Sequence, residues 1–263
     1  MSQLLHLENL HNTRDLGGME TTDGKSIRRG KLIRSGHLFG GSAADMTALG
    51  NLIDTVVDFR TPQEKEEKPD PVLSGVKFWH IPIFDSLKAG VTREEQSDAQ
   101  VIQMMMRDHR KAKAYMCGIY TDFVSVPFEV SQYETFVRLL LEPHEKAVLW
   151  HCTAGKDRAG FASVIVEELL GVDRAAIRAD YLKTNECLAD DIRGLIEMFY
   201  AMEGEENPEA ELALRYLFGA REDFWDAVYA KIEELYGGFD GFISDGLHIS
   251  ADEREALKQM YLA

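Results

Sequence analysis

A short apolar run near the middle of the chain constrains the fold more than any other segment. Ala147-Val148-Leu149-Trp150 carries no polar residue at alternate positions, so it predicts a strand that is buried on both faces. Apolar side chains then recur at three- and four-residue spacing over residues 161–170, which predicts a helix ended by Gly171. Strands buried on both faces occur mainly in parallel sheets covered by helices. We therefore expect an α/β fold.

The remaining pattern extends this expectation to the whole chain. Residues 55–59 and 76–83 read as strands, and residues 128–141 as a helix. After residue 172 the periodicity is helical to the end, with candidate helices at 173–188, 189–202, 208–218, 221–236 and 250–261. This order predicts one domain over residues 1–263, with a mainly parallel central sheet flanked by helices. A helical cap or lid would come from residues 86–125 or from part of the tail.

Charge is spread unevenly along the 263 residues. The chain carries a net charge of −16, and residues 186–263 hold 19 acidic but only 6 basic side chains. A strongly negative field opposes nonspecific binding to nucleic acid or to anionic membranes. It leaves room for a small anion held in a locally positive loop. The tail is therefore predicted to be an acidic, solvated, helical part of the domain.

Three further features bear on the compartment. Three cysteines do not suggest a disulfide framework, and no stretch approaches the ~18 apolar residues of a membrane span. The first residues also lack a basic segment followed by a long apolar one. We expect a cytoplasmic protein, with export by a route without a cleaved signal as the alternative, and the oligomeric state stays open.

The segment that carries chemistry joins the buried strand to the next helix and reads WHCTAGKDRAG. The first N–H groups of a helix have no partner inside it, and the helix dipole is positive there. A loop that wraps this end can bind a tetrahedral anion, and a glycine lets its backbone approach closely. The expected phosphate-binding residues are Thr153, Ala154, Gly155, Lys156, Asp157 and Arg158.

Cys152 begins this loop. A free cysteine has a pKa of ~8.5, and helix N-termini and nearby cations lower such values to about 3.5–7.5. We therefore expect a thiolate that attacks phosphorus. Arg158 would bind two phosphate oxygens through its planar guanidinium and stabilise the charge that develops on them in the transition state.

Residue types, spacing and context together resemble a known family. Cys-x5-Arg preceded by His, between a strand and a helix, is typical of cysteine-dependent phosphatases, and HCTAGKDR is similar to the HCxxGKDR loop of a bacterial tyrosine phosphatase family. Three other segments resemble motifs of that family, namely NTRDLGG (12–18), VVDFRTPQE (56–64) and DYLKTN (180–185). Together the four segments span residues 12 to 185. The acidic tail contains no matching motif.

The resemblance implies a cysteine-phosphatase-like fold and a two-step reaction. Cys152 would take the phosphate as phosphocysteine, and water would then hydrolyse this intermediate without a metal or an organic cofactor. The leaving group needs a proton donor. Asp157, inside the loop, is the family's favoured candidate, while Asp58 and Asp85 are alternatives. Expected substrates are phosphotyrosyl proteins, with dual specificity open; a phosphoinositide phosphatase with the same mechanism is an alternative.

Several nearby residues are predicted to support the site. His151 is expected to hydrogen-bond the loop backbone and fix Cys152. Asp58 and Arg60 are either a buried ion pair at a strand end or residues that orient Arg158. The ammonium of Lys156 would add positive potential for a second anionic group on the substrate.

Ala159 departs from the family pattern. The family often has Ser or Thr after the loop arginine, and its hydroxyl assists loss of the thiolate in the second step. With Ala159 we expect slow breakdown of phosphocysteine. A catalytically inactive phosphate-binding module, and less favourably a sulfur-transfer or arsenate-reducing enzyme, are the competing interpretations.

Overall fold

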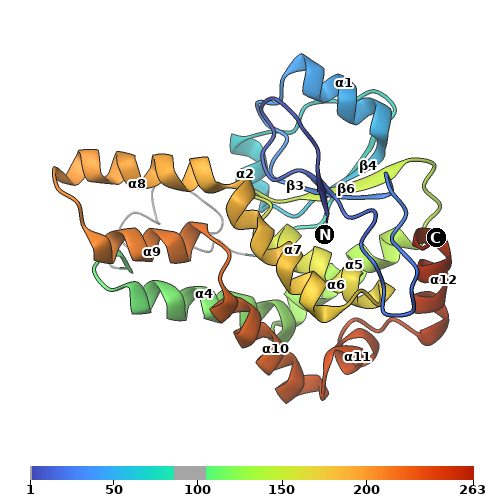
Figure 1. Cartoon of the computed structure of the whole chain (residues 1–263). Helices are drawn as coiled ribbons and strands as arrows, with labels where there is room; N and C mark the ends of the chain where they lie inside the picture. The colour runs from blue at the N-terminus through green and yellow to red at the C-terminus, as the bar shows by residue number, and fades with distance from the viewer. Residues whose placement is uncertain (1, 86–104) are drawn as a thin grey trace.

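A computed structural model describes residues 2–85 and 105–263 (Figure 1). The described residues contain a six-stranded sheet in the order β1-β2-β3-β6-β4-β5. Strands β3, β6, β4 and β5 are parallel, and β1 and β2 extend the sheet antiparallel beside β3. The predicted mainly parallel sheet is confirmed. Its strands are β1 (Gln3–Leu4), β2 (Arg14–Asp15), β3 (Leu32–Ser35), β4 (Ile53–Asp58), β5 (Lys77–His80) and β6 (Ala147–His151).

Helices cover this sheet and make up most of the second half of the chain. Those before β6 are α1 (Ala43–Leu52), α2 (Pro62–Glu67), α4 (His109–Ser125) and α5 (Pro127–Leu140). Those after it are α6 (Arg158–Leu170), α7 (Arg174–Cys187), α8 (Ala189–Glu203), α9 (Pro208–Phe218), α10 (Glu222–Tyr236), α11 (Phe239–Gly241) and α12 (Ala251–Tyr261), with a π-helical turn at Phe242–Gly246. The predicted tail helices are confirmed within two residues, whereas α6 begins three residues earlier than predicted.

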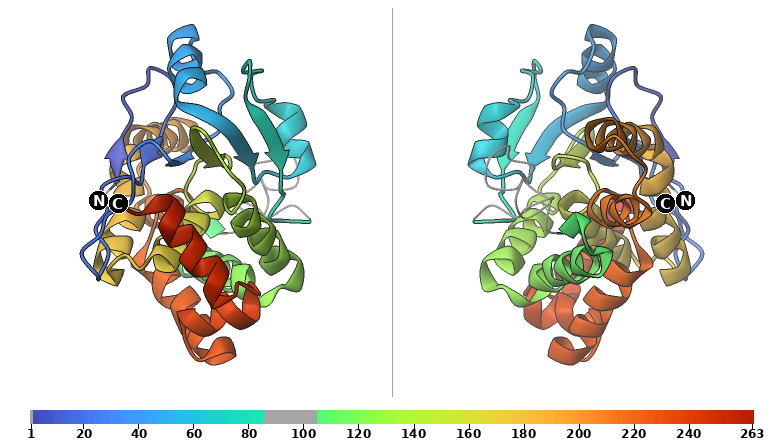
Figure 2. Two further views of the ribbon diagram at one scale, coloured as in Figure 1. Left: turned by 90° about the vertical axis from the view of Figure 1, so that its right-hand side faces the viewer. Right: turned by 90° about the vertical axis from the view of Figure 1, so that its left-hand side faces the viewer.

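Strand β6 lies at the centre of the sheet and is buried along its whole length. Val148 and Trp150 face a large core formed with helices α4, α5, α6, α10 and α12. Leu149 faces the opposite way, into a smaller core under α1. Figure 2 shows α1 on one side of the sheet and the larger helical group on the other. The apolar run at 147–150 therefore has no alternation because both of its faces are covered.

The C-terminal tail divides between the core and a projecting pair of helices. Helices α10 and α12 contribute Phe224, Val228 and Leu257 to the large core. Helices α8 and α9 pack on each other and extend away from the sheet, on the left of Figure 1. Helix α9 also contributes Ala213 and Leu217 to the large core, so the acidic tail is packed into that core through α9 as well as through α10 and α12.

The segment 86–125, predicted as one candidate cap, is described only in part. Residues 86–104 lie outside the described residues. Helix α4 buries Met116, Ile119 and Phe123 in the large core, so this half of the segment is a core helix rather than a cap. Among the described residues the pair α8–α9 is the remaining candidate for a cap.

In the part of the chain that the structure describes, no helix has both the length and the apolar character needed to cross a membrane.

Candidate active site

The loop that joins β6 to α6 lies at the carboxyl edge of the parallel strands. Strand β6 ends at His151 and α6 begins at Arg158, so residues 152–157 connect the predicted strand to the predicted helix, which begins three residues earlier than expected. Because β6 pairs with both β3 and β4, the loop sits in the middle of that edge. Ligand sites of open α/β sheets are found at this edge. Cys152 is buried there as a free thiol.

Hydrogen bonds from outside hold the carbonyl groups of the loop. The Cys152 oxygen lies 3.1 Å from His151 Nδ1, and the Thr153 oxygen accepts from the His37 N–H at 3.0 Å. The Ala154 oxygen accepts from Asn12 Nδ2 at 3.0 Å. In a trans peptide the next N–H points opposite to the C=O. The N–H groups of residues 153, 154 and 155 therefore point inward, and none of the three donates to another described residue.

Gly155 is required by both space and backbone conformation. Its φ is +69°, in the left-handed region, and a Cβ atom would lie 2.5 Å from the Ser35 oxygen. The Gly155 oxygen accepts from Arg34 Nη2 at 2.7 Å. The loop is thus held against the end of β3, at a separation that only glycine permits.

Arg158 is held by a carboxylate that the sequence did not single out. Its Nη1 lies 2.6 Å from Glu64 Oε2 and its Nη2 lies 2.8 Å from Glu64 Oε1, so the pair is bidentate. Glu64 also accepts from the Thr153 hydroxyl. Burial opposes ionisation of Glu64, but the Arg158 guanidinium outweighs it and lowers the pKa of this carboxyl. Arg158 is therefore fixed beside the loop by an ionised partner.

The sequence contains a signal for Glu64, but for another role. Thr61 followed by Glu64 three residues later is a capping-box pattern, and both side chains do cap the start of α2. The pattern predicts where a helix begins. It does not predict which arginine the same carboxylate meets after folding.

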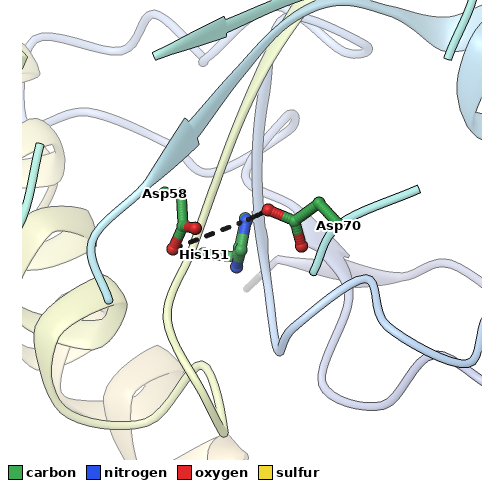
Figure 3. Close-up of side chains that lie close together, drawn as sticks. All are labelled: Asp58, Asp70 and His151. Atoms are coloured by element: carbon green, nitrogen blue, oxygen red, sulfur yellow. Dashed lines mark hydrogen bonds and ion pairs between the residues drawn. The ribbon is translucent and has the colours of Figure 1, made fainter. Parts of the chain in front are cut away.

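Behind the loop, His151 lies between two aspartates (Figure 3). Its Nε2 is 3.1 Å from Asp70 Oδ2 and 3.9 Å from Asp58 Oδ1. Arg60 Nη2 lies 2.9 Å from Asp58 Oδ2 and 3.0 Å from Asp70 Oδ2. Of the two earlier interpretations, these contacts correspond to the buried ion pair, because Arg158 is oriented by Glu64 instead.

These groups have the composition of a metal site but not its electrostatics. Asp58, Asp70 and His151 could each supply one ligand atom. The Arg60 guanidinium already lies between the two carboxylates and satisfies them as a cation would. A second group, Asp108, His109 and Glu209, is partly exposed and contains a 2.6 Å pair between His109 and Glu209.

The three candidate proton donors lie in different surroundings. Burial opposes ionisation of Asp58, but His151 and Arg60 outweigh it and hold the pKa of this carboxyl far below its usual range. Asp58 thus carries no proton at neutral pH. Asp85 is exposed at the end of the first described segment. Asp157 is buried in the loop itself, with its Oδ1 accepting from the Tyr120 hydroxyl at 2.9 Å.

The ammonium of Lys156 is bonded to the end of helix α9. Its buried Nζ donates to the Leu217 oxygen at 2.7 Å and to the Gly219 oxygen at 3.3 Å, and lies 3.2 Å from Asp157 Oδ1. Carbonyls at the C-terminal end of α9 lack helical partners and carry the negative end of the helix dipole, so they attract an ammonium. That the ammonium of Lys156 adds positive potential for a second substrate anion therefore stays a prediction, made for a side chain that also bonds to the end of α9.

A cavity of about 550 Å³ adjoins the loop. Thr153 and Ala154 form part of its wall, and residues of α8 form another part, including Leu195 and Met198. Asp190 and Asp191 at the start of α8 add negative charge to the lining. The volume falls within the range of about 300–1,000 Å³ that small-molecule sites occupy.

The chain is similar to known proteins along most of its length. The model of the tyrosine phosphatase family matches residues 5–263. A Cupriavidus necator protein, whose name places it among tyrosine-protein phosphatases, is 31% identical over 98% of this chain and 88% of its own length. The triple specificity protein phosphatase PtpB of Mycobacterium tuberculosis is 27% identical, over 89% of this chain and 90% of the relative. A tyrosine-protein phosphatase of Nostoc commune is 27% identical over 81% of the chain and 67% of its own length.

Proposed function

The chain belongs to the tyrosine phosphatase family, and we propose that Cys152 is its nucleophile, which takes the phosphate of phosphotyrosine as a phosphocysteine. The observation that carries this proposal is the orientation of the loop. Three successive N–H groups point inward at residues 153–155, beside the buried thiol and the start of α6. A phosphate dianion satisfies such donors, and the same donors favour a thiolate over a thiol.

The first chemical step transfers the phosphoryl group. The Cys152 sulfur forms a bond to phosphorus while the bond from phosphorus to the ester oxygen breaks. Arg158, held by Glu64, and the inward N–H groups stabilise the charge on the equatorial oxygens. Asp157 gives its proton to the departing oxygen, so the leaving group departs as an alcohol or a phenol.

The second step regenerates the enzyme. A water attacks phosphorus, gives one proton to the ionised Asp157, and the bond from phosphorus to sulfur breaks to release the Cys152 thiolate. Ala159 is buried at the start of α6 and offers no hydroxyl to the departing sulfur. Breakdown of phosphocysteine is therefore expected to limit turnover, with a burst of leaving group before the steady state. Ala159→Ser should shrink the burst and raise kcat; rapid-mixing traces of the wild type with excess substrate that show no burst would contradict this.

Among phosphorylated substrates, the cavity favours a phosphopeptide over a polyphosphorylated head group. Lys156 is buried, and its ammonium is bonded to carbonyls at the end of α9. Asp190 and Asp191 instead line the cavity beside the loop. Negative lining repels further phosphates but accepts the neutral or basic side chains that flank a phosphotyrosine.

An aryl phosphate assay without added metal tests the function. The wild type should release phosphate, and Cys152→Ser should lose at least about 10³-fold of kcat, as removal of a covalent nucleophile does. A phosphate-binding module would give no turnover in either protein. Rates on phosphotyrosyl and phosphoseryl peptides and on phosphatidylinositol phosphate then rank the substrates; a preference for the lipid contradicts the phosphopeptide assignment.

A further inference from the structure

We propose that Asp70 is a positioning residue for the reaction: through His151 it maintains a positive charge directly behind Cys152. No motif in the sequence marks this aspartate, which lies between α2 and β5. The inference builds on the proposed role of Cys152, but it concerns the charge state of a different side chain. That charge state can be measured without any assay of activity.

The contacts of the His151 ring define its protonation. The ring is fully buried, with Nδ1 3.1 Å from the Cys152 carbonyl oxygen and Nε2 3.1 Å from Asp70 Oδ2. A carbonyl oxygen and an ionised carboxylate can only accept hydrogen bonds. Both ring nitrogens must then carry a proton, so His151 is an imidazolium cation.

The contact of Asp70 with Arg60 favours a negative charge on the Asp70 carboxylate. Its Oδ2 also lies 3.0 Å from Arg60 Nη2, and arginine stays charged in proteins. Its Oδ1 is buried and has no hydrogen-bond partner among the described residues. The negative charge of Asp70 is therefore balanced through one oxygen, by Arg60 and by His151.

Charge balance in the buried cluster supports the same assignment. Asp58 on β4 and Asp70 supply two negative charges, while Arg60 and protonated His151 supply two positive charges. With a neutral imidazole the cluster would hold one uncompensated negative charge away from water, which is costly. Burial alone disfavours the imidazolium, but Asp58 and Asp70 outweigh it and raise the pKa of His151 above its usual value.

Asp70, rather than Asp58, accepts the hydrogen bond from the proton on His151 Nε2. Asp58 lies farther from His151 Nε2, at 3.9 Å against 3.1 Å. Its oxygens also already accept the N–H, Nε and Nη2 groups of Arg60. Figure 3 shows the ring between the two carboxylates. Removing the charge of Asp70 should therefore remove the main hold on the Nε2 proton.

The positive charge on His151 affects the proposed nucleophile, Cys152, in two ways. The imidazolium belongs to the residue that precedes Cys152, so its charge favours the thiolate through space. Its Nδ1–H also fixes the Cys152 carbonyl, which orients the Thr153 N–H into the loop. Asp70 touches neither the sulfur nor the substrate, and it acts only by keeping His151 charged.

The direct test is the protonation of His151 in the wild-type protein. Nitrogen-15 NMR of the histidine ring should report protons on both Nδ1 and Nε2 at pH 7.5. A ring with a single proton at that pH overturns the proposal, whatever the activity of the enzyme. This measurement needs no variant, so it decides the question even where a substitution at Asp70 prevents folding.

Asp70→Asn provides the functional test. The amide matches the carboxylate in size and can donate to a neutral Nε2, so the ring can stay in place while its charge is lost. The pH midpoint for alkylation of Cys152 by iodoacetamide, and the acidic limb of kcat/KM, should both move up by about one pH unit. An alkylation profile identical to the wild type overturns the proposal.

A second histidine–aspartate pair supplies a matched control. Asp54 Oδ1 lies 3.6 Å from His144 Nδ1 at the opposite end of β4, far along the strand from the loop. Asp54→Asn should leave both the alkylation midpoint and the acidic limb unchanged; an equal shift in this control overturns a specific role for Asp70. Turnover that survives in Cys152→Ser contradicts the proposed function. The NMR measurement on His151 does not depend on that result, so the two proposals can fail independently.

Discussion

Two buried networks of charged side chains flank the phosphate loop, and they contact different parts of it. The network on the β4 side reaches the Arg158 side chain through Glu64 and the Cys152 carbonyl through His151. The network on the α7 side reaches the loop backbone, through the bond from Arg34 to the Gly155 oxygen and through Asn12, which accepts from Arg14 and donates to the Ala154 oxygen. In the proposed mechanism, the β4 side would hold Arg158 and the residue before Cys152, while the α7 side would mainly set the shape of the loop.

The α7-side network combines Arg14 and Asp180, which belong to two of the motif segments, with Arg34, which lies outside them. Asp180 lies 3.1 Å from Arg14 Nη2 and 3.4 Å from Arg34 Nη1, and all three side chains are fully buried. Burial and the neighbouring Arg14 lower the pKa of Arg34 to about 10, so it keeps its charge at neutral pH. Segments 12–18 and 180–185 therefore meet at one ion cluster beneath the loop.

The largest expected effect is a loss of folding stability when the α7-side network is broken. Asp180→Asn leaves two buried arginines without their carboxylate, so the free energy of unfolding should fall by about 3–5 kcal/mol. Enzyme that remains folded should keep kcat within about threefold of the wild type. Urea unfolding and kcat on an aryl phosphate measure the two quantities. A fully stable variant with a large loss of kcat would reverse the comparison.

The next effect should fall on the reaction. Glu64→Gln breaks the bidentate pair with Arg158, so kcat/KM should drop by about 10²-fold, the size of a lost transition-state contact. The fall in unfolding free energy should be smaller than for Asp180→Asn. A stability loss without a kinetic loss would place Glu64 with the structural network.

A smaller effect tests the assignment of Asp157. The Tyr120 hydroxyl holds Asp157 Oδ1, which directs the proton to Oδ2. Tyr120→Phe should lower kcat about tenfold on alkyl phosphates, whose leaving groups need the proton, and less on aryl phosphates. Tyr181→Phe is the matched control, since its hydroxyl donates to Tyr120 and not to Asp157. Equal losses on both substrate types would assign the proton donor elsewhere.

The smallest expected effect is a pH-dependent change in the free energy of unfolding, caused by Glu167 near the α7-side network. Burial, with Asp180 nearby, raises the pKa of Glu167 well above its usual value, so the folded protein holds a proton that the unfolded chain releases above about pH 4.3. The contribution of protonated Glu167 to the free energy of unfolding is fully present below that pH. It decreases as the pH rises. Glu167→Gln removes the loss, so its unfolding free energy should exceed the wild type by about 1 kcal/mol at pH 8 and match it near pH 4. A less stable variant at pH 8 contradicts this sign.

Local patterns were sufficient for some parts of the structure. The start of the loop and the burial of β6 follow from neighbouring residues, because an apolar run is a property of a short segment, whereas the end of the loop was predicted three residues too late. The position of Cys152 in the loop follows from the same spacing. Glycine at 155 could likewise be anticipated from its place in an anion-binding turn.

Contacts between distant segments could not be predicted in this way. The burial of Lys156 depends on the end of α9, 61 residues later, and nothing in the loop indicates that helix. The pairing of Arg158 with Glu64 requires α2 to pack beside the loop. Asp70 lies outside every motif and acquires its partner only through the fold. Residues 86–125 were one of two candidates for a cap, because an amphipathic pattern such as that of α4 does not specify what its apolar face contacts.

The most direct measurement is the site of phosphate during turnover. Wild-type enzyme mixed rapidly with an aryl phosphate, quenched within the first turnover and digested should yield phosphate on the peptide that contains Cys152. The burst of released phenol should match the amount of this peptide. Phosphate bound to another residue, or a burst that persists in Cys152→Ser, would contradict the mechanism.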